Sequence, residues 1–458
     1  MGRILPCLPA NCRRTDVRGR YNKKEEKIMM RRNMKRMMAA ALAGVMTASL
    51  ALTGCGGKDK KSDSGEKVIT VWSWDVALMQ LQAAAEEYQK DHPDIKFEFE
   101  EMGTDQIYKK LSTSLATGNG IADIISVEGE VLVGYADKFP EGFLDVSDVV
   151  ETDDFLPSKI SEVSYKDKIH AFPWDAGPEG LFYRTDYFEQ AGVSPEDIKT
   201  WDDLIEAGKK IEAACKTPAG DPVKMIPVDP KKSTIYSLIR SQLGIGVFDE
   251  EGNPIVDDER SIQAMEKAKE IYDSGVALNY NGWDEYEQTV VNESVACIPE
   301  AVWMIGTIKD KGPQTEGKWG VMDLPAIEGG EFSCSNGGSD VTINAKTDYP
   351  DEVKDFVKFA MTDVDLQASG FENYGLYPSY IPAYENELFQ KGDPFFGEEN
   401  IYDIFIENGK KVAEIPISPN GQEAGDSIGA AVSKILLNGE EVEAVMKDLQ
   451  KELETKFK

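Results

Sequence analysis

The chain has 458 residues, of which 82 are acidic and 50 are basic, and its formal net charge at neutral pH is −32. This excess of negative charge disfavours nucleic acid and anionic membrane surfaces as partners, because like charges repel. Only two histidines occur, His92 and His170, and the HExxH and CxxC patterns are absent. No Ser-His-Asp, Cys-His or zinc-binding arrangement is therefore evident, and no bound metal is expected.

The first 54 residues have the pattern of a leader for export. A basic stretch at 31–38 precedes an uncharged apolar run at 39–54, and Leu52-Thr53-Gly54-Cys55 matches the bacterial lipobox, in which the cysteine becomes the lipidated first residue. An uncleaved membrane anchor is the alternative, but the apolar run is near the lower length limit for a span. We expect a lipoprotein anchored through Cys55 to the extracytoplasmic face of the cell membrane, of the Gram-positive surface type.

Residues 1–28 belong to neither part of this leader. Lys24-Glu25-Glu26 is what a ribosome-binding AAGGAGGA would encode if translated, so we expect translation to begin at Met29 or Met30. Residues 55–67 are expected to form a flexible tether after the lipidated cysteine. Residues 55–458 hold 38 basic and 79 acidic residues, a net charge of −41. An odd number of further cysteines leaves the disulfide pattern open; they are Cys215, Cys297 and Cys334.

The elements predicted after the tether alternate between strands and helices. They are a strand at 68–72, a helix over 78–88, a strand at 95–99, a helix over 107–115 and a strand at 124–127. This β-α-β-α-β order predicts a parallel sheet with right-handed crossovers. Ligands of such sheets bind beyond the carboxyl ends of the strands, where residues 72–75 and 126–129 fall.

The run AFPWDAGPEG at 171–180 has too much Gly and Pro for a helix or strand interior, and too much Trp and Phe for a solvated linker. It precedes a strand, GLFYR, and a second series of elements. We predict helices at 203–214, 261–274, 284–292, 350–361 and 442–453, and strands at 294–298, 319–324 and 340–343. About 400 mature residues exceed one hydrophobic core, so two domains are expected.

Several motifs occur in a specific order: VITVWSW, YKKLSTSLATGNGIADII, IHAFPWDAGPEGLFYRTDYFEQAGV, TWDDLIEAGKKI, KWGVMDLPAIEGG, NGGSDVTINAKT and DEVKDFVKFA. Together they resemble the bacterial ABC-transporter extracellular solute-binding proteins of the carbohydrate group, the relatives of maltose-binding protein. The resemblance implies an α/β, two-lobed, periplasmic-binding-protein-like fold. Each lobe is expected to be a mainly parallel sheet flanked by helices, with the ligand cleft between the lobes.

The same resemblance implies lobe boundaries and a hinge. The N-terminal lobe is expected to hold 68–175 plus about 320–345, and the C-terminal lobe about 178–318 plus 348–458. About three chain segments are expected to cross between the lobes, which close about them. The run at 171–180 is then the first crossing, with a hinge shaped by Gly177, Pro178 and Gly180.

The function implied by the resemblance is that of a carbohydrate receptor, a monomer and not an enzyme, which delivers its ligand to an ABC permease in the membrane. Three alternatives stay open. The same fold can bind a non-sugar solute, such as a peptide or a polyamine. The chain can also be a lipid-tethered glycosidase, which needs two carboxylates flanking a bond, or a structural surface lipoprotein.

Aromatic rings cover the apolar face of a sugar, and carboxylates or amides fix its hydroxyl groups. On this basis the ligand-binding residues are expected to be Trp174, Asp175, Trp74, Asp75, Glu128, Trp303, Glu300, Ser339, Asp340 and Tyr374. Trp283 is either on the surface or in the cleft. Structural roles are expected for Trp201 and Trp319 in a core, for Asp123 as a cap and for Arg184 beside a neighbouring acid.

Overall fold

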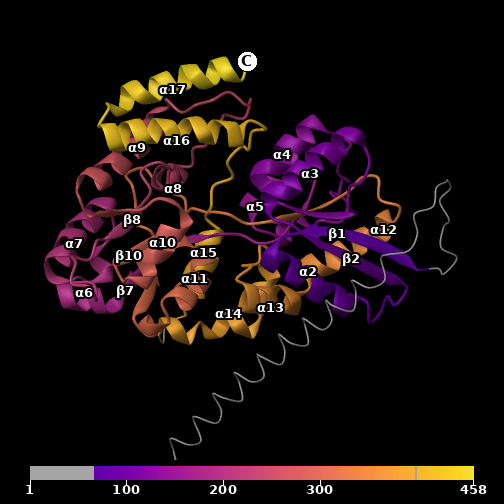
Figure 1. The fold of residues 1–458 in the computed structure, drawn as a ribbon, viewed down its shortest axis with the longest axis horizontal. Coiled ribbons are helices and arrows are strands. Elements are labelled where there is room, and N and C mark those ends of the chain that lie inside the picture. Colours follow the sequence, from indigo (N-terminus) through magenta and orange to yellow (C-terminus); the bar gives the residue numbers. More distant parts are fainter. Residues whose placement is uncertain (1–65, 398–399) are drawn as a thin grey trace, which may run out of the picture. The chain divides into compact units, whose positions relative to one another are not determined.

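A computed structural model describes residues 66–397 and 400–458. The predicted leader, Cys55 and nearly all of the predicted tether lie outside the described residues. Strands and helices are interleaved along the described chain (Figure 1). Within these two ranges, no helix combines the length and the apolar character needed to cross a bilayer.

The first sheet has five strands in the order β2-β1-β3-β12-β6. β1 pairs in parallel with β2 and β3, as the β-α-β-α-β order predicts, whereas β12 is antiparallel to both β3 and β6. The carboxyl ends of β1, β3 and β6 therefore share one edge of the sheet. The bounds are β1 Lys67–Ser73, β2 Ile95–Glu101, β3 Ile124–Val127, β6 Phe172–Pro173 and β12 Asp340–Ile343.

Helices cover this sheet and complete the first lobe. In α2 (Asp75–Tyr88), Leu81, Ala85 and Tyr88 recur at helical spacing and are buried in the core beside the strands. α3 ends at Gly118, whose left-handed φ of 70° stops the helix where the sequence predicts. The other elements are α3 Thr104–Thr117, α4 Gly129–Lys138, α5 Pro157–Val163, α12 Pro350–Thr362, α13 Val364–Tyr374 and the hairpin β4 Ser164–Tyr165 with β5 Lys168–Ile169.

The second lobe contains a sheet with the same plan. β7 is antiparallel to both β10 and β11, and β8 is parallel to β9. Backbone hydrogen bonds join the two groups, since Met225 O, just before β8, accepts from Cys297 N at the start of β10. Among the strands of this sheet, β7 is therefore the one that is antiparallel to the others. The bounds are β7 Glu179–Arg184, β8 Ile226–Val228, β9 Ala277–Asn279, β10 Cys297–Ala301 and β11 Trp319–Met322.

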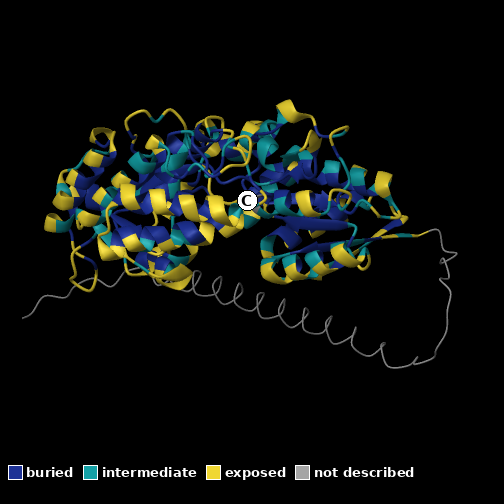
Figure 2. Ribbon diagram, turned by 90° about the horizontal axis from the view of Figure 1, so that it is seen from above, coloured by how far each residue is buried: buried dark blue, intermediate teal, exposed yellow. Residues whose placement is uncertain are grey.

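Helices surround the second sheet and enclose two hydrophobic cores. A capping box is present in α7, because Thr200 and Asp203 exchange hydrogen bonds at its amino end. Figure 2 shows buried residues on the strands and exposed residues on the outer helix faces. The bounds are α6 Thr185–Ala191, α7 Trp201–Ala214, α8 Thr234–Gln242, α9 Glu259–Asp273, α10 Gly282–Val291, α11 Met304–Lys311, α14 Glu387–Lys391, α15 Tyr402–Gly409, α16 Gly421–Asn438 and α17 Val442–Lys456.

Three segments connect the lobes and hydrogen-bond to one another. The first, 174–179, joins β6 to β7, and the second, 334–339, leads into β12. Glu179 N donates to Cys334 O, and Asn336 N donates to Gly177 O. The third, 376–379, pairs on the other side, where Ala176 N donates to Tyr377 O. Each crossing strand, β7 or β12, is the antiparallel strand of the sheet that it enters.

The two-lobed α/β fold is thus confirmed, but the packing differs from the expected boundaries at two places. α12 and α13, expected in the C-terminal lobe, lie in the first lobe, where α12 buries Val353, Phe356 and Val357 in the core. β11, expected in the N-terminal lobe, pairs with β7 of the second. In both cases the apolar face of the element is buried where its neighbouring strands lie, and chain order alone does not reveal this.

Candidate functional site

The carboxyl edge of the first sheet presents three of the predicted residues. Trp74 follows β1 and is half-buried, while Asp75 opens α2 and is exposed. Asp75 has a φ of 43°, a left-handed conformation that costs energy in a non-glycine residue and is enriched at functional positions. Glu128 follows β3 and accepts a hydrogen bond from the Tyr108 hydroxyl at 2.8 Å. Because β1 and β3 are paired neighbours, these residues lie along one edge.

A buried cluster of charges fixes two crossing segments to this lobe. The Nζ atom of Lys159, on α5, lies 2.9 Å from Asp340 Oδ1 and 2.9 Å from Glu162 Oε2, and its side chain is 2% exposed. Asp175 Oδ1 accepts a hydrogen bond from Ser339 N at 2.8 Å. The predicted residues Asp175, Ser339 and Asp340 are therefore brought together, around a lysine that the sequence does not single out.

The ionisation of this cluster reflects burial and neighbouring charge. Burial raises the pKa of Asp175 to about 6, although Lys159 and the bond from Ser339 oppose the shift. Burial works against the charge of Lys159, but Asp340 and Glu162 outweigh it and raise the lysine pKa. Burial likewise raises the pKa of Asp340, opposed by Lys159. We describe Lys159 and Asp340 as an ion pair because their charged atoms are 2.9 Å apart.

Four aromatic side chains gather at the carboxyl ends of the strands in the second lobe, and we call them the aromatic platform. Trp303 follows β10, Trp283 and Tyr286 lie on α10, and Tyr280 follows β9. The ring centroid of Trp283 lies 5.7 Å from that of Trp303 and 5.4 Å from that of Tyr286. The ring centroids of Tyr280 and Tyr286 are 4.8 Å apart. Trp283 is 49% exposed. The platform offers apolar ring faces with polar edges.

Glu300 is hydrogen-bonded into this platform from β10 and is itself buried. Its Oε2 accepts from the Tyr286 hydroxyl at 3.1 Å, and its Oε1 accepts from Ala301 N and Asn336 Nδ2, each at 2.9 Å. Burial raises the pKa of Glu300, and these three donors oppose the shift. On the neighbouring strand β7, burial and the charge of Glu300 raise the pKa of Glu179 well above its ordinary value.

Three other predicted residues have different surroundings from those expected. Trp174 is 1% exposed and packs in the first core, so it does not face an open cleft. Gly180 lies inside β7, where a Cβ atom would come 3.1 Å from Phe405 and Val321; it is a packing position within a strand and not part of a connecting segment. Tyr374 is half-buried at the end of α13, against the first core. Gly177 and Pro178 do lie in the first crossing.

The predicted structural roles of Trp201, Trp319 and Arg184 are confirmed, whereas Asp123, expected as a cap, instead links β1 to the segment after β12. Trp201 and Trp319 are buried. Arg184 forms ion pairs with Asp186 and Glu293. Asp123 accepts hydrogen bonds from Thr70 and Thr347. The open question of the disulfides is also answered for the described cysteines, which are buried and unpaired: Cys215, Cys297 and Cys334.

Within 66–397 and 400–458, no group of His, Cys, Asp or Glu side chains has the arrangement of a metal site. A Gly-x-Ser-x-Gly run at 425–429 lies inside α16, and Ser427 Oγ donates to Glu452. Nucleophilic serines of this motif stand on a strand-to-helix turn, so this run is part of an ordinary helix.

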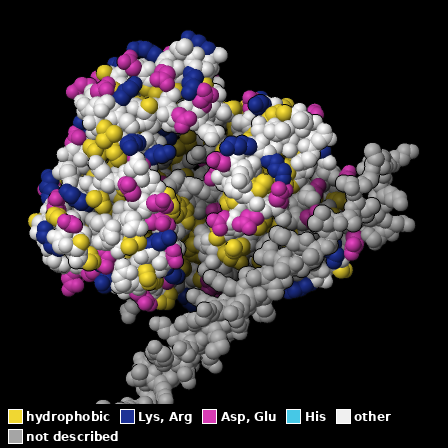
Figure 3. Space-filling model, viewed as in Figure 1, with side chains coloured by type: hydrophobic (Ala, Val, Ile, Leu, Met, Phe, Trp, Pro, Cys, Tyr) yellow, Lys and Arg dark blue, Asp and Glu magenta, His cyan; other side chains and the backbone are white. Residues whose placement is uncertain are grey.

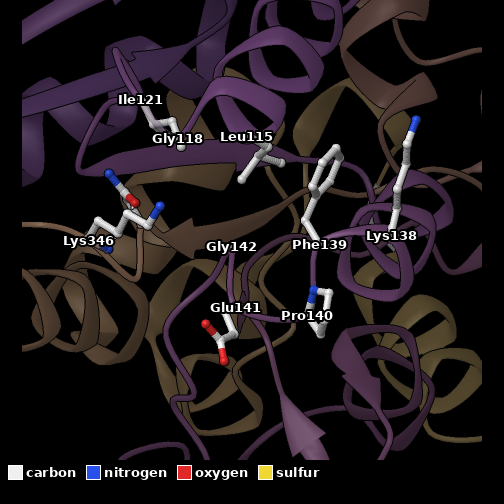
Figure 4. A pocket seen from close by; sticks show the side chains of 10 residues that line it. Leu115, Gly118, Ile121, Lys138, Phe139, Pro140, Glu141, Gly142 and Lys346 are labelled. Carbon is white, nitrogen blue, oxygen red and sulfur yellow. Dashed lines mark hydrogen bonds between the residues drawn. The ribbon is translucent and has the colours of Figure 1, made fainter.

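The described surface is hollowed between the lobes. In Figure 3, apolar side chains gather on the wall near α10, and acidic side chains gather on the opposite wall near α5. A separate cavity of about 350 Å³ is lined by Leu115, Phe139 and Lys346, with Leu115 and Phe139 facing one another (Figure 4). It lies where β3 begins and β12 ends, at the edge of the sheet opposite to Glu128, and none of the predicted ligand-binding residues lines it.

Four residues of this site are not found by sequence reasoning. Tyr280 and Tyr286 flank Trp283 in the aromatic-rich stretch YNGWDEY, which is a usable signal. Asn336 precedes the glycine pair Gly337-Gly338, which is a weaker signal. No signal in the sequence marks Lys159, because it lies in an ordinary helical sequence and its partners are distant in the chain.

Comparisons with known proteins place this arrangement among binding proteins. The family model described as bacterial extracellular solute-binding protein matches residues 77–365. A lactose-binding protein of Rhizobium radiobacter is 29% identical over 390 residues, which cover 82% of this chain and 87% of the relative. An arabinooligosaccharide-binding protein of Bacillus subtilis is 24% identical, and the aligned residues cover 87% of this chain and 94% of the relative.

Solved structures share the fold. The sugar-binding protein MalE of Xanthomonas citri superposes with a TM-score of 0.73 at 16% identity, covering 85% of this chain and 97% of that one. A transporter-associated binding protein of B. animalis subsp. lactis, in complex with β-1,6-galactobiose, superposes with a TM-score of 0.67 at 25% identity, covering 85% and 97%.

Proposed function

Because this chain belongs to the bacterial extracellular solute-binding protein family, we propose that it is the carbohydrate receptor of an ABC importer. It binds a sugar or an oligosaccharide between its lobes, closes about the crossing segments and delivers the ligand unchanged to a membrane permease. The names of the relatives, lactose-binding and arabinooligosaccharide-binding proteins, support a saccharide as the ligand.

The observation that carries this proposal is the aromatic platform. Trp283 and Trp303 present ring faces at the carboxyl ends of the strands, and Trp283 is 49% exposed although it is a large apolar side chain. A pair of aromatic rings that is partly open to water, such as Trp283 and Trp303, costs solvation free energy unless a ligand covers it. A sugar has one apolar face for such rings and hydroxyl groups for the carboxylates nearby.

We assign the remaining predicted residues by where they lie. Trp303 and Glu300 act from the second lobe, with Trp283 and Tyr286. Trp74, Asp75 and Glu128 act from the edge of the first sheet, with Tyr374 at its margin. Asp340 is fully buried and paired with Lys159, so it supports Asp175 and Ser339 and does not itself touch the ligand. Trp174 supports the first crossing from the core.

The cellular setting follows from the leader. We propose that Cys55 is lipidated and holds the receptor on the outer face of the cell membrane. Residues 55–67 then form a flexible tether between the lipid anchor and the folded lobes. The permease subunits are its protein partners, and the receptor acts as a monomer without enzymatic activity or a cofactor.

A cationic solute such as a polyamine is a second candidate. Glu128 and Asp75 are exposed carboxylates at the edge of the first sheet, and they would attract an ammonium group. Two exposed carboxylates favour a polyamine, whereas the aromatic platform of the second lobe favours a sugar. The relatives are named as saccharide-binding proteins, so we place the sugar first.

Thermal unfolding against a panel of solutes tests the proposal. The panel holds lactose, maltose, raffinose, arabinooligosaccharides, spermidine and amino acids. A ligand at about a hundred times its dissociation constant stabilises the native state by about 2.7 kcal/mol. We expect a shift with one saccharide class, lost in Trp303→Ala, with the saccharide recovered intact. A shift only with spermidine would replace the ligand class, and cleavage of the saccharide would overturn the receptor function.

A further inference from the structure

Asn336, in the second crossing segment, connects the two crossings with the aromatic platform. Its backbone N–H donates to Gly177 O at 2.8 Å, which ties it to the first crossing. Its backbone carbonyl accepts from Trp303 Nε1 at 3.1 Å, and its side-chain amide donates to Glu300 Oε1 at 2.9 Å. One residue thus contacts the hinge region, a platform ring and the buried carboxylate of the platform.

The approach of the two crossings at this point is close. A Cβ atom at Gly177 would lie 1.9 Å from Asn336 O, so a side chain at 177 is incompatible with the packing. A Cβ atom at Gly337 would lie 3.7 Å from Trp303 Nε1. The position of Asn336 is therefore set by the first crossing on one side and by the platform on the other.

Two glycines separate Asn336 from the first lobe. Gly337 and Gly338 have φ values of 76° and 117°, in the left-handed region that glycine tolerates. Ser339, which follows them, donates to Asp175 of the charged cluster. Within the second crossing, Gly337 and Gly338 are therefore positioned to absorb a rotation of one lobe against the other, because the residues on both sides are hydrogen-bonded.

We propose that Asn336 is a positioning residue that couples the hinge to the ligand-binding surface by holding Trp303 and the carboxylate of Glu300 in register with the crossing segments. The consequence for ligand binding rests on the proposed function. The coupling itself is a property of the ligand-free protein and is tested there, so the failure of one is distinguishable from the failure of the other.

The amide of Asn336 favours the ionised form of Glu300, since it donates to that carboxylate. The other titratable groups around Glu300 are Glu179 on β7, Tyr286 on α10 and Tyr280 before α10. Of these, Glu179 is the other acid, so the titration is followed in a Glu179→Gln background. The full chain is labelled with 5-fluorotryptophan, and the fluorine resonance of Trp303 is assigned from its loss in Trp303→Phe.

We expect the Trp303 resonance to titrate with Glu300 and to stop titrating in Glu300→Gln. In Asn336→Ala the carboxylate loses a donor, and in Asn336→Asp it gains a neighbouring negative charge. Both changes are expected to raise the midpoint by about one pH unit or more. Ser335→Ala is the matched control, because Ser335 is the exposed neighbour in the same segment; its midpoint should equal that of the parent.

The outcome that overturns the inference is a Trp303 resonance whose midpoint is the same in Asn336→Ala, Asn336→Asp and Ser335→Ala. A Trp303 resonance that does not respond to Glu300→Gln overturns it as well. Asn336 is exposed, so these variants are expected to fold. If Asn336→Ala unfolds, the inference is tested by the midpoint of Asn336→Asp, which keeps the shape of the side chain.

Discussion

The two lobes use buried carboxylates in opposite ways. In the first, Lys159 faces Asp340 and Glu162 directly, so a buried positive charge offsets part of the carboxylate charge. In the second, Glu300 accepts hydrogen bonds from the neutral groups of Tyr286, Ala301 and Asn336, and aromatic rings lie beside them. The charged cluster thus anchors the crossing segments, whereas under the proposed function the platform keeps polar and apolar surface for a ligand.

Removal of the lysine is expected to have the largest effect. Lys159→Met leaves Asp340 buried without its counter-charge, which costs about 3–5 kcal/mol of unfolding free energy. Urea denaturation measures the loss. Lys354→Met is the matched control, since Lys354 pairs with an Asp148 side chain that is 67% exposed, and such a surface pair contributes about 1 kcal/mol at most. Equal losses in the two variants would contradict an anchoring role.

The crossing segments themselves are sensitive to added volume. In Gly177→Ala the new Cβ would meet Asn336 O at 1.9 Å, and such overpacking costs about 1–3 kcal/mol. Gly425→Ala is the control, because no atom lies within 4 Å of its Cβ position inside α16; helix propensity predicts a gain of up to about 1 kcal/mol there. Thermal melts of both variants check that Gly177→Ala lowers the stability and that Gly425→Ala raises it. A neutral Gly177→Ala would mean that the crossings are not closely packed.

Much of the fold follows from local pattern. The strand predicted at 68–72 is β1, and the helix predicted at 350–361 is α12, because periodic apolar residues mark both. The strand predicted at 294–298 is found at Cys297–Ala301, shifted toward Pro299 and Glu300. These residues have low strand propensity, and pairing with β7 overrides it. Glycine-containing helices such as α16 are also missed, since tertiary packing sustains them.

The candidate site is less accessible to sequence reasoning. Asp175, Ser339 and Asp340 were expected in the cleft, and the structure brings them into contact. Trp174 lies one residue before Asp175, and successive residues of an extended chain point to opposite sides, so its ring enters the core. Lys159 reaches Ser339 across 180 residues of sequence, a contact that only the folded crossing creates.

The charged cluster also predicts a dependence of stability on pH. A carboxyl group whose pKa is raised in the folded state favours folding at low pH, and this contribution is lost as the pH rises through the folded pKa. Asp175, with a pKa of about 6, therefore makes the protein less stable at pH 7 than at pH 4. Asp175→Asn keeps an acceptor for Ser339 N and removes the titration.

Relative to Asp175→Asn, the parent is expected to lose about 2 kcal/mol between pH 4 and pH 7. Urea denaturation of both proteins at several pH values measures the difference. Curves that stay parallel over this interval would show that Asp175 is not held in a buried, protonated form at low pH, and the contrast between the lobes would then rest on Lys159 alone.

The platform provides the smallest and most specific test. Trp283 is 49% exposed, so Trp283→Ala should leave unfolding free energy almost unchanged. If its ring covers one face of the ligand, affinity for the stabilising saccharide falls by about tenfold, or about 1.4 kcal/mol. Phe332→Ala is the control, because Phe332 is 45% exposed and lies outside the platform. Calorimetric titration that gives equal affinities for both variants would remove Trp283 from the binding surface, and with it the argument that the rings are exposed in order to be covered by a ligand.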